Sequence, residues 1–136
     1  FINSFVSTDE TSRMVAITAE EPILYGWYFQ TGPQLFGEGS PFPLRIKNDE
    51  PARRSILIKL TDESTIFLSL FGQSSILSGP LLGDAPGILS VIGQQESWEI
   101  DAATNLDGGR ASFFWDGTRV LDEVTPVGSV LCVTEE

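Results

Sequence analysis

Short apolar or alternating runs, separated at regular intervals by Gly, Pro, Asn and Asp, occupy most of the chain. This spacing is typical of an all-β sandwich or barrel, and no stretch sustains the 3.6-residue periodicity of an amphipathic helix. The clearest unit is a hairpin in which Ser55 to Leu60 alternates, Asp62 and Glu63 turn the chain, and Thr65 to Phe71 returns. We therefore expect one antiparallel β-sandwich of the jelly-roll or immunoglobulin-like kind.

The N-terminal third predicts two parts. Residues 1–12 join a short apolar run to a polar stretch and are expected to form an arm or an edge strand, with the sandwich domain over residues 13–136. Strands are expected at Met14 to Thr18 and at Ile23 to Phe29. Alternate residues of the second strand share one face, and these large side chains predict that the face belongs to the core. They are Ile23, Tyr25, Trp27 and Phe29.

Residues Thr31 to Pro43 are predicted to form a long loop, because Gly and Pro recur through them. Three apolar side chains lie in this loop: Leu35, Phe36 and Phe42. Apolar loop residues either fold back onto the core or face a partner, and both alternatives stay open. A strand resumes at Leu44 to Lys47.

The last third has the most regular spacing. An irregular connection over Gly72 to Pro86 precedes it, and four strands with turns between them are predicted after that. The strands are Ile88 to Ile92, Ser97 to Asp101, Ala111 to Trp115 and Gly128 to Thr134, and the turns are Gly93 to Gln95, Asn105 to Gly109 and Asp116 to Thr118. Large aromatic residues on both faces of the third strand predict that it is central or lies at an interface.

Nineteen acidic and eight basic residues give the chain a net charge of −11. Such a surface repels phosphate backbones and anionic lipids, so no nucleic acid and no membrane is expected as a partner. Five of the bases nevertheless lie in the basic segment, residues 45–59: Arg45, Lys47, Arg53, Arg54 and Lys59. Either Arg53 and Arg54 pair with Asp49, Glu50, Asp62 or Glu63, or the segment docks an acidic neighbour, such as the acid-rich end of another copy.

Composition excludes most familiar catalytic constellations. The chain has no His and one Cys, so it cannot form His-dependent triads, Cys/His dyads or His-ligated zinc sites. Asn105, Asp107 and Gly108 match only the middle of a calcium loop, and a hairpin turn explains them better. Carboxylate pairs such as Glu96 with Glu99 leave a glycoside hydrolase as the least favoured hypothesis. We predict no enzyme, no catalytic residue, no metal and no cofactor.

Aromatic residues suggest a second class of function. Flat rings beside carboxylates suit the hydroxyl groups of sugars, so a lectin-like module that binds a glycan is the alternative. Core packing explains the same side chains, and only an exposed pair would favour the lectin. The residues concerned are Tyr25, Trp27, Tyr28, Trp98 and Trp115.

Three C-terminal stretches carry a family resemblance: Gln94 to Asp101, Ala111 to Trp115 and Gly128 to Glu135. Their order resembles the terminal strands of small β-sandwich accessory proteins that decorate tailed-phage heads or join virion parts. The resemblance implies a virion structural protein without enzymatic activity, repeated on a symmetric lattice.

We therefore predict a non-enzymatic, oligomeric assembly protein, located in a virion or outside the cell. Its expected partners are other copies of itself or a capsid-type scaffold. The candidate partner-binding residues are Leu35, Phe36, Phe42, Arg45, Lys47, Arg53 and Arg54.

Overall fold

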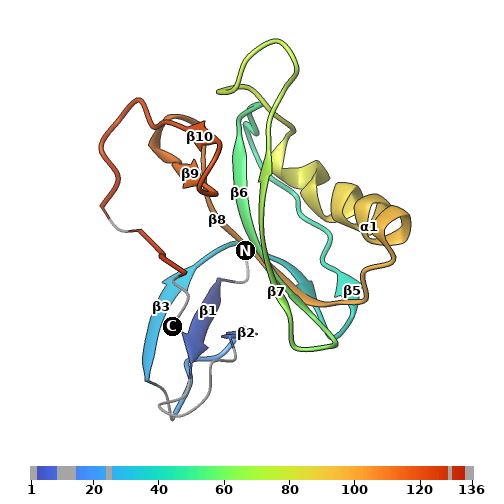
Figure 1. Ribbon diagram of the computed structural model, residues 1–136. Coiled ribbons are helices and arrows are strands. Elements are labelled where there is room, and N and C mark those ends of the chain that lie inside the picture. The colour runs from blue at the N-terminus through green and yellow to red at the C-terminus, as the bar shows by residue number, and fades with distance from the viewer. Residues whose placement is uncertain (1–2, 9–14, 24–25, 129, 134–136) are drawn as a thin grey trace.

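The computed structural model describes residues 3–8, 15–23, 26–128 and 130–133 (Figure 1). The described chain is mostly β-structure, with one α-helix and two short 3₁₀ helices. In order, the elements are β1 (Ser4–Thr8), β2 (Val15–Thr18), β3 (Trp27–Thr31), β4 (Gln34–Gly37), β5 (Ser40–Pro41), β6 (Arg54–Leu60), β7 (Thr65–Leu70), η1 (Leu82–Asp84), α1 (Ala85–Glu96), β8 (Ile100–Gly108), η2 (Gly109–Ala111), β9 (Phe114–Trp115) and β10 (Val120–Leu121). None of the helices in these ranges is long and apolar enough to cross a membrane.

The strands form three antiparallel sheets. The largest has the order β5-β4-β8-β6-β7, the second β2-β1-β3 and the third β10-β9. The predicted hairpin is confirmed as β6 and β7, which pair from Arg54 opposite Leu70 to Lys59 opposite Thr65. The antiparallel, mostly β character of the chain is therefore confirmed.

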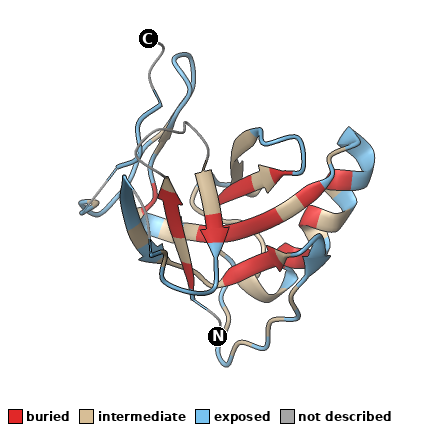
Figure 2. Ribbon diagram, turned by 90° about the horizontal axis from the view of Figure 1, so that it is seen from below, coloured by how far each residue is buried: buried red, intermediate tan, exposed pale blue. Residues whose placement is uncertain are grey.

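The strand β6 is buried on both faces, because it lies between two hydrophobic layers. Ile56 and Ile58 pack in one cluster with Leu89 of α1. Leu57 lies on the opposite face and packs in a second cluster with Val6 of β1. The five-stranded sheet thus carries α1 on one face and the three-stranded sheet on the other, and we call these three layers the body. Figure 2 shows the buried residues following the strands of the body, while the outer side of α1 is exposed.

The chain passes from the three-stranded to the five-stranded sheet at Gly32 and Pro33, between β3 and β4. There the Gly32 N–H donates to the Asn105 carbonyl and the Asn105 N–H to the Pro33 carbonyl, each at 3.1 Å. A Cβ at Gly32 would lie 3.1 Å from the Asn3 backbone at a φ of +144°, which explains why glycine stands at this position. A bent strand that changes sheets is the usual way to make such a corner.

This path corrects the loop predicted over Thr31 to Pro43. The segment contains β4 and β5, and Leu35 and Phe36 are buried in the cluster beneath α1. The alternative in which these two side chains fold back onto the core is therefore confirmed. Phe42 is half-buried, with its ring beside Gly37.

The N-terminal expectations also need correction. The sequence predicts an arm or edge strand over residues 1–12, but β1, the part of this stretch that the structure describes, is the central strand of its sheet. The buried hydroxyls of Ser4 and Thr104 lie 2.5 Å apart and bond β1 to β8. The expected core face over Ile23 to Phe29 is wrong at Ile23 and Trp27, which are exposed, because β3 begins only at Trp27 and is an edge strand. Phe29 is half-buried against the core, and Tyr25 lies outside the described residues.

The helix α1 replaces the predicted strand Ile88 to Ile92 and the turn Gly93 to Gln95. Its first turn contains Pro86, a position that tolerates proline. It ends at Ser97, which has a left-handed φ of +57°, and the Trp98 N–H donates to the Gly93 carbonyl at 2.8 Å. The expectation that no helix occurs is therefore wrong.

The strand β8 runs through the predicted turn Asn105 to Gly109. Asn105 faces Ile56 and Asp107 faces Ser55, so Leu106 is the extra residue of a β-bulge. These polar residues therefore lie at a bend within β8, and the chain does not reverse its direction there. The predicted strand Ser97 to Asp101 begins only at Ile100, the described residues of Gly128 to Thr134 form no strand, and β9 covers the end of the predicted strand Ala111 to Trp115.

Candidate functional site

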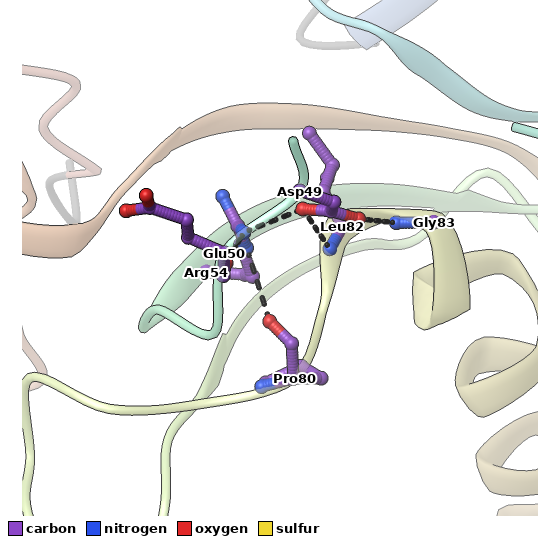
Figure 3. A network of polar contacts seen from close by, with 6 residues as sticks. All are labelled: Asp49, Glu50, Arg54, Pro80, Leu82 and Gly83. Carbon is purple, nitrogen blue, oxygen red and sulfur yellow. Dashed lines mark hydrogen bonds and ion pairs between the residues drawn. The ribbon is translucent and has the colours of Figure 1, made fainter. Parts of the chain in front are cut away.

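Asp49 is the centre of a polar network in the basic segment (Figure 3). Its carboxylate accepts hydrogen bonds from the backbone N–H groups of Leu82, at 3.1 Å, and Gly83, at 2.7 Å. Arg54 forms an ion pair with the same carboxylate at 3.5 Å, and also donates to the Glu50 carbonyl at 2.7 Å. Pairing with a nearby acid, one of the two alternatives for the basic segment, is therefore confirmed for Arg54.

An open pocket of about 390 Å³ lies beside this network. Its lining includes Asp49, Arg54 and Asp107, but their polar groups already have partners within the chain. Asp107 accepts a hydrogen bond from the Gly108 N–H at 2.6 Å. Within the described ranges, no three acidic or thiol side chains gather closely enough to hold a metal ion. The network therefore fastens the loop before β6 to η1, and its geometry indicates a structural role.

Arg53, the neighbour of Arg54, is a buried cation with 1% exposure. Its Nε donates to the Ser112 Oγ at 2.8 Å, and its Nη2 donates to the backbone carbonyls of Asp122, at 2.8 Å, and Ser112. Burial lowers the pKa of Arg53, while the charges of Asp122 and Glu123 act in the opposite direction. The guanidinium nevertheless stays protonated, so it binds the C-terminal segment as a charged donor and is not part of an exposed docking patch.

The backbone of Arg53 is bonded to two further segments. Its N–H donates to the Leu77 carbonyl at 3.0 Å, and its carbonyl accepts from the Gly109 N–H at 2.7 Å. Arg53 therefore joins the connection after β7, the end of β8 and the C-terminal segment at one point.

Residues 109–128, which we call the C-terminal arm, form a hairpin outside the two larger sheets (Figure 1). In β9 and β10, Trp115 faces Val120 and Phe114 faces Leu121. The N–H groups of Val124 and Thr125 both donate to the Arg110 carbonyl, at 2.7 and 3.0 Å. These bonds and those of Arg53 hold the base of the arm.

The C-terminal arm exposes several large apolar side chains. Trp115 is 63% exposed and Val120, its cross-strand partner, 51%. Phe113 and Val124 are exposed as well. Apolar side chains gathered on one projecting element are typical of a contact surface. In the sequence, the aromatic residues of Ala111 to Trp115 predict a strand that is central in its sheet or lies at an interface. The strand β9 belongs to a two-stranded sheet and is not central, and the interface stays a prediction.

Asp116 closes the turn of the arm, and the predicted turn Asp116 to Thr118 is confirmed. Its Oδ1 accepts from the N–H groups of Arg119, at 2.7 Å, and Thr118, at 2.9 Å. Gly117, between Asp116 and Thr118, has a φ of +90°. The hydrogen bonds from Arg119 and Thr118 lower the pKa of Asp116 from its ordinary value of 3.8.

We expect this turn to open in acid. A lowered carboxyl pKa stabilises the hairpin above the ordinary value of 3.8, and this contribution is lost as the pH falls through the lower folded value. The amide resonances of Thr118 and Arg119, followed by NMR from neutral pH downward, should shift together below pH 3.8. Asp116→Asn keeps an acceptor that does not titrate and should remove the transition. A transition that persists in this variant would assign it to another carboxylate.

The predicted contact residues thus have different environments. Leu35 and Phe36 belong to the core, Arg53 is buried, and Arg54 is half-buried and ion-paired. Arg45 and Lys47 are exposed. Among the described residues thirteen large apolar side chains are exposed, none of them a predicted contact residue, and eight of the thirteen lie at or beyond Val91.

The aromatic residues give the lectin hypothesis limited support. Trp27 stacks on Phe29 with ring centroids 5.9 Å apart and an interplanar angle of 10°. The rings of Phe5 and Tyr28 are 6.2 Å apart. In each of these two described pairs one ring is exposed and the other is half-buried, so neither is the exposed pair that a sugar platform needs. A glycan partner stays a prediction.

Comparison with known proteins gives this chain no relative. No family model, no curated protein and no solved structure matches it. Its function is therefore inferred from its own exposed and buried residues. The surface used for this inference is the C-terminal arm with its exposed apolar side chains.

Proposed function

We propose that this protein is a non-enzymatic assembly subunit that binds other copies of itself through the C-terminal arm. The observation that carries the proposal is the cross-strand pair of Trp115 and Val120, which are 63% and 51% exposed. They lie on a hairpin whose base is held by the hydrogen bonds of the Arg53 side chain and of the Arg110 carbonyl. Tryptophan is among the residues that most often dominate binding energy at interfaces. A buried cation at the base of the hairpin keeps this apolar surface in one orientation.

The architecture supports the same proposal. Val6 and Ile17 of the three-stranded sheet pack against Leu57 and Ala102 of the five-stranded sheet, which supports a sandwich related to the jelly-roll or immunoglobulin-like kind. A capsid decoration or connector subunit, in a virion or outside the cell, is the particular assembly that the resemblance of the C-terminal stretches suggests.

The test is the mass of the protein in solution. We expect the wild-type protein to form a defined oligomer in analytical ultracentrifugation, and the double variant Trp115→Thr/Val120→Thr to weaken it at least about tenfold, as is usual for loss of an aromatic anchor. Threonine keeps the β-propensity of both positions, so the hairpin itself should persist.

Val91→Thr is the matched control, because Val91 is 54% exposed on α1, outside the arm. This variant should leave the oligomer unchanged. A wild-type protein that is monomeric at every concentration and salt would overturn the proposed function. An oligomer that the double variant does not weaken would show that the arm is not its contact.

A further inference from the structure

The outer side of β7 is an open sheet edge. β7 is the last strand in the order β5-β4-β8-β6-β7, and among the described strands it pairs only with β6. Among the described residues, no backbone hydrogen bond outside this pairing reaches Thr65–Leu70. In an antiparallel strand every second residue directs its N–H and C=O to the outer side, so β7 presents a row of free donors and acceptors.

This edge lacks the usual protection against pairing. Natural sheets guard their edges with charged residues, proline, bulges or very short strands. The opposite edge, β5, has two residues and ends in Pro41. In contrast, β7 has six residues, Thr-Ile-Phe-Leu-Ser-Leu, without a charge or a proline.

Side-chain packing holds the edge in place on both faces. Ile66, Leu68 and Leu70 pack against the cluster beneath α1. Phe67 packs against the cluster shared with the three-stranded sheet. Because side-chain packing already holds β7 in place on both faces, little conformational entropy is lost when a partner strand pairs with it.

We propose that β7 pairs with β7 of a second copy, antiparallel about a two-fold axis, so that the five-stranded sheet continues from one protomer into the next. The inference rests on the proposed self-assembly and adds a second contact to that of the C-terminal arm. A two-fold contact needs a surface that complements itself. A strand without charges meets this condition, and it adds no repulsion of its own in a chain whose net charge of −11 opposes the association of two copies.

The pleat restricts the register of this pairing. Residues directly opposite each other in an antiparallel pair lie on the same face of the sheet, so an even-numbered residue must face an even-numbered one. The register centred on Leu68 sets Ile66 against Leu70, and Thr65 against Phe71. It covers Phe71, which is 49% exposed at the end of β7, and sets Glu63 against the neutral Gln73. The register centred on Phe67 would set Phe71 against Glu63, so the first is favoured.

Phe71→Lys tests the contact at an exposed position, where the fold does not need the ring. Two lysines would enter the proposed interface, and we expect the two-copy association to weaken at least about tenfold. Ile76→Lys is the matched control, because Ile76 is 47% exposed, five residues further along the chain, and outside the proposed pairing. Equal masses for both variants and the wild type would overturn the proposal.

A cysteine at the two-fold axis tests the register. In a Cys132→Ser background, which removes the one native cysteine, Leu68→Cys leaves a single thiol that faces its own counterpart. Opposite Cα atoms in an antiparallel pair are about 4.5–5.5 Å apart, and a disulfide requires less than about 7 Å. Mild oxidation should therefore give a cross-linked dimer from Leu68→Cys and none from Ile76→Cys. The reverse result, or no cross-link in an associating protein, would contradict this register.

The two proposals fail in different ways. A monomeric wild-type protein would overturn self-assembly and the β7 contact together. An oligomer that the arm variant weakens and Phe71→Lys does not would overturn the β7 contact alone. If both contacts exist, the arm variant should leave a two-copy species that Phe71→Lys then dissociates. High salt should strengthen this species, because it screens the repulsion between two acidic copies.

Discussion

Replacing Arg53 with methionine should lower the free energy of unfolding by about 2 to 3 kcal/mol and release the C-terminal arm from the body. The side chain supplies three hydrogen bonds, two to Ser112 and one to the Asp122 carbonyl. Methionine fills much of the volume but donates nothing, so these acceptors would lose their charged donor in a site from which water is largely excluded. Urea unfolding followed by tryptophan fluorescence would measure the loss, and hydrogen exchange of the arm amides would show the release.

Two further variants separate the buried charge from the general effect of removing a base. Arg45→Met removes an exposed arginine of the same basic segment and should change stability by less than about 0.5 kcal/mol. Arg53→Lys keeps the charge but not the planar fork that reaches acceptors on both sides of the hairpin, at Ser112 before β9 and at Asp122 after β10, so an intermediate loss is expected. Equal stabilities for Arg53→Met and Arg45→Met would show that the contacts to Ser112 and Asp122 contribute nothing.

The features that sequence reasoning found correctly depend on neighbours along the chain. The hairpin of β6 and β7 follows from alternation on both sides of a short polar turn. The turn at Asp116 follows from an acid, a glycine and a threonine in a row, and its hydrogen bonds reach only two and three residues along the chain. Both are local in sequence, so the residue pattern contains the information needed to predict them.

The features that the sequence pattern did not predict depend on contacts between residues that are far apart in the chain. Asn105 and Asp107 stay in β8 because the backbone of Asn105 is bonded at the corner of Gly32 and Pro33, more than seventy residues away. The hydrophobic pattern did not predict α1, because the buried face of this helix includes the small residues Ala85 and Gly93, whereas Val91 is exposed. A hydrophobic pattern that counts large side chains therefore finds no helical face there.

Arg53 and Arg54 show the same limit at the candidate site. They are adjacent and chemically identical, but one is buried against Ser112 and the other forms an ion pair with Asp49. Arg54 is the first residue of β6 and Arg53 directly precedes the strand. Their side chains meet different parts of the molecule, and only the fold specifies which parts these are. For Arg54 the partner is five residues away and was among the predicted acids; for Arg53 it is fifty-nine residues away.

Gly79→Ala should destabilise the protein by about 2 kcal/mol, in the range of overpacked sites. A Cβ at Gly79 would overlap the carbonyl oxygen of Ala52 and lie 2.8 Å from its carbon. Both atoms belong to the backbone, so no side-chain rotation relieves the contact. The segment after β7 would have to move away from Ala52 and Arg53, and it would lose the bond from the Arg53 N–H to the Leu77 carbonyl. The midpoint of urea unfolding at constant slope measures the effect.

Gly87→Ala is the same substitution where the structure leaves room, and it should have the opposite sign. Gly87 lies exposed in the first turn of α1, and apart from its chain neighbours and the backbone of its own helix no atom lies within 4 Å of the added Cβ. Alanine lowers the backbone entropy of the unfolded chain and favours the helix, so we expect stabilisation by about 0.5 to 1 kcal/mol. A neutral Gly79→Ala beside a stabilising Gly87→Ala would mean that the segment after β7 does not pack against Ala52. In that case Arg53 would hold the C-terminal arm without help from the segment after β7. The effects of the Arg53 variants would then be attributed to the bonds with Ser112 and Asp122 alone.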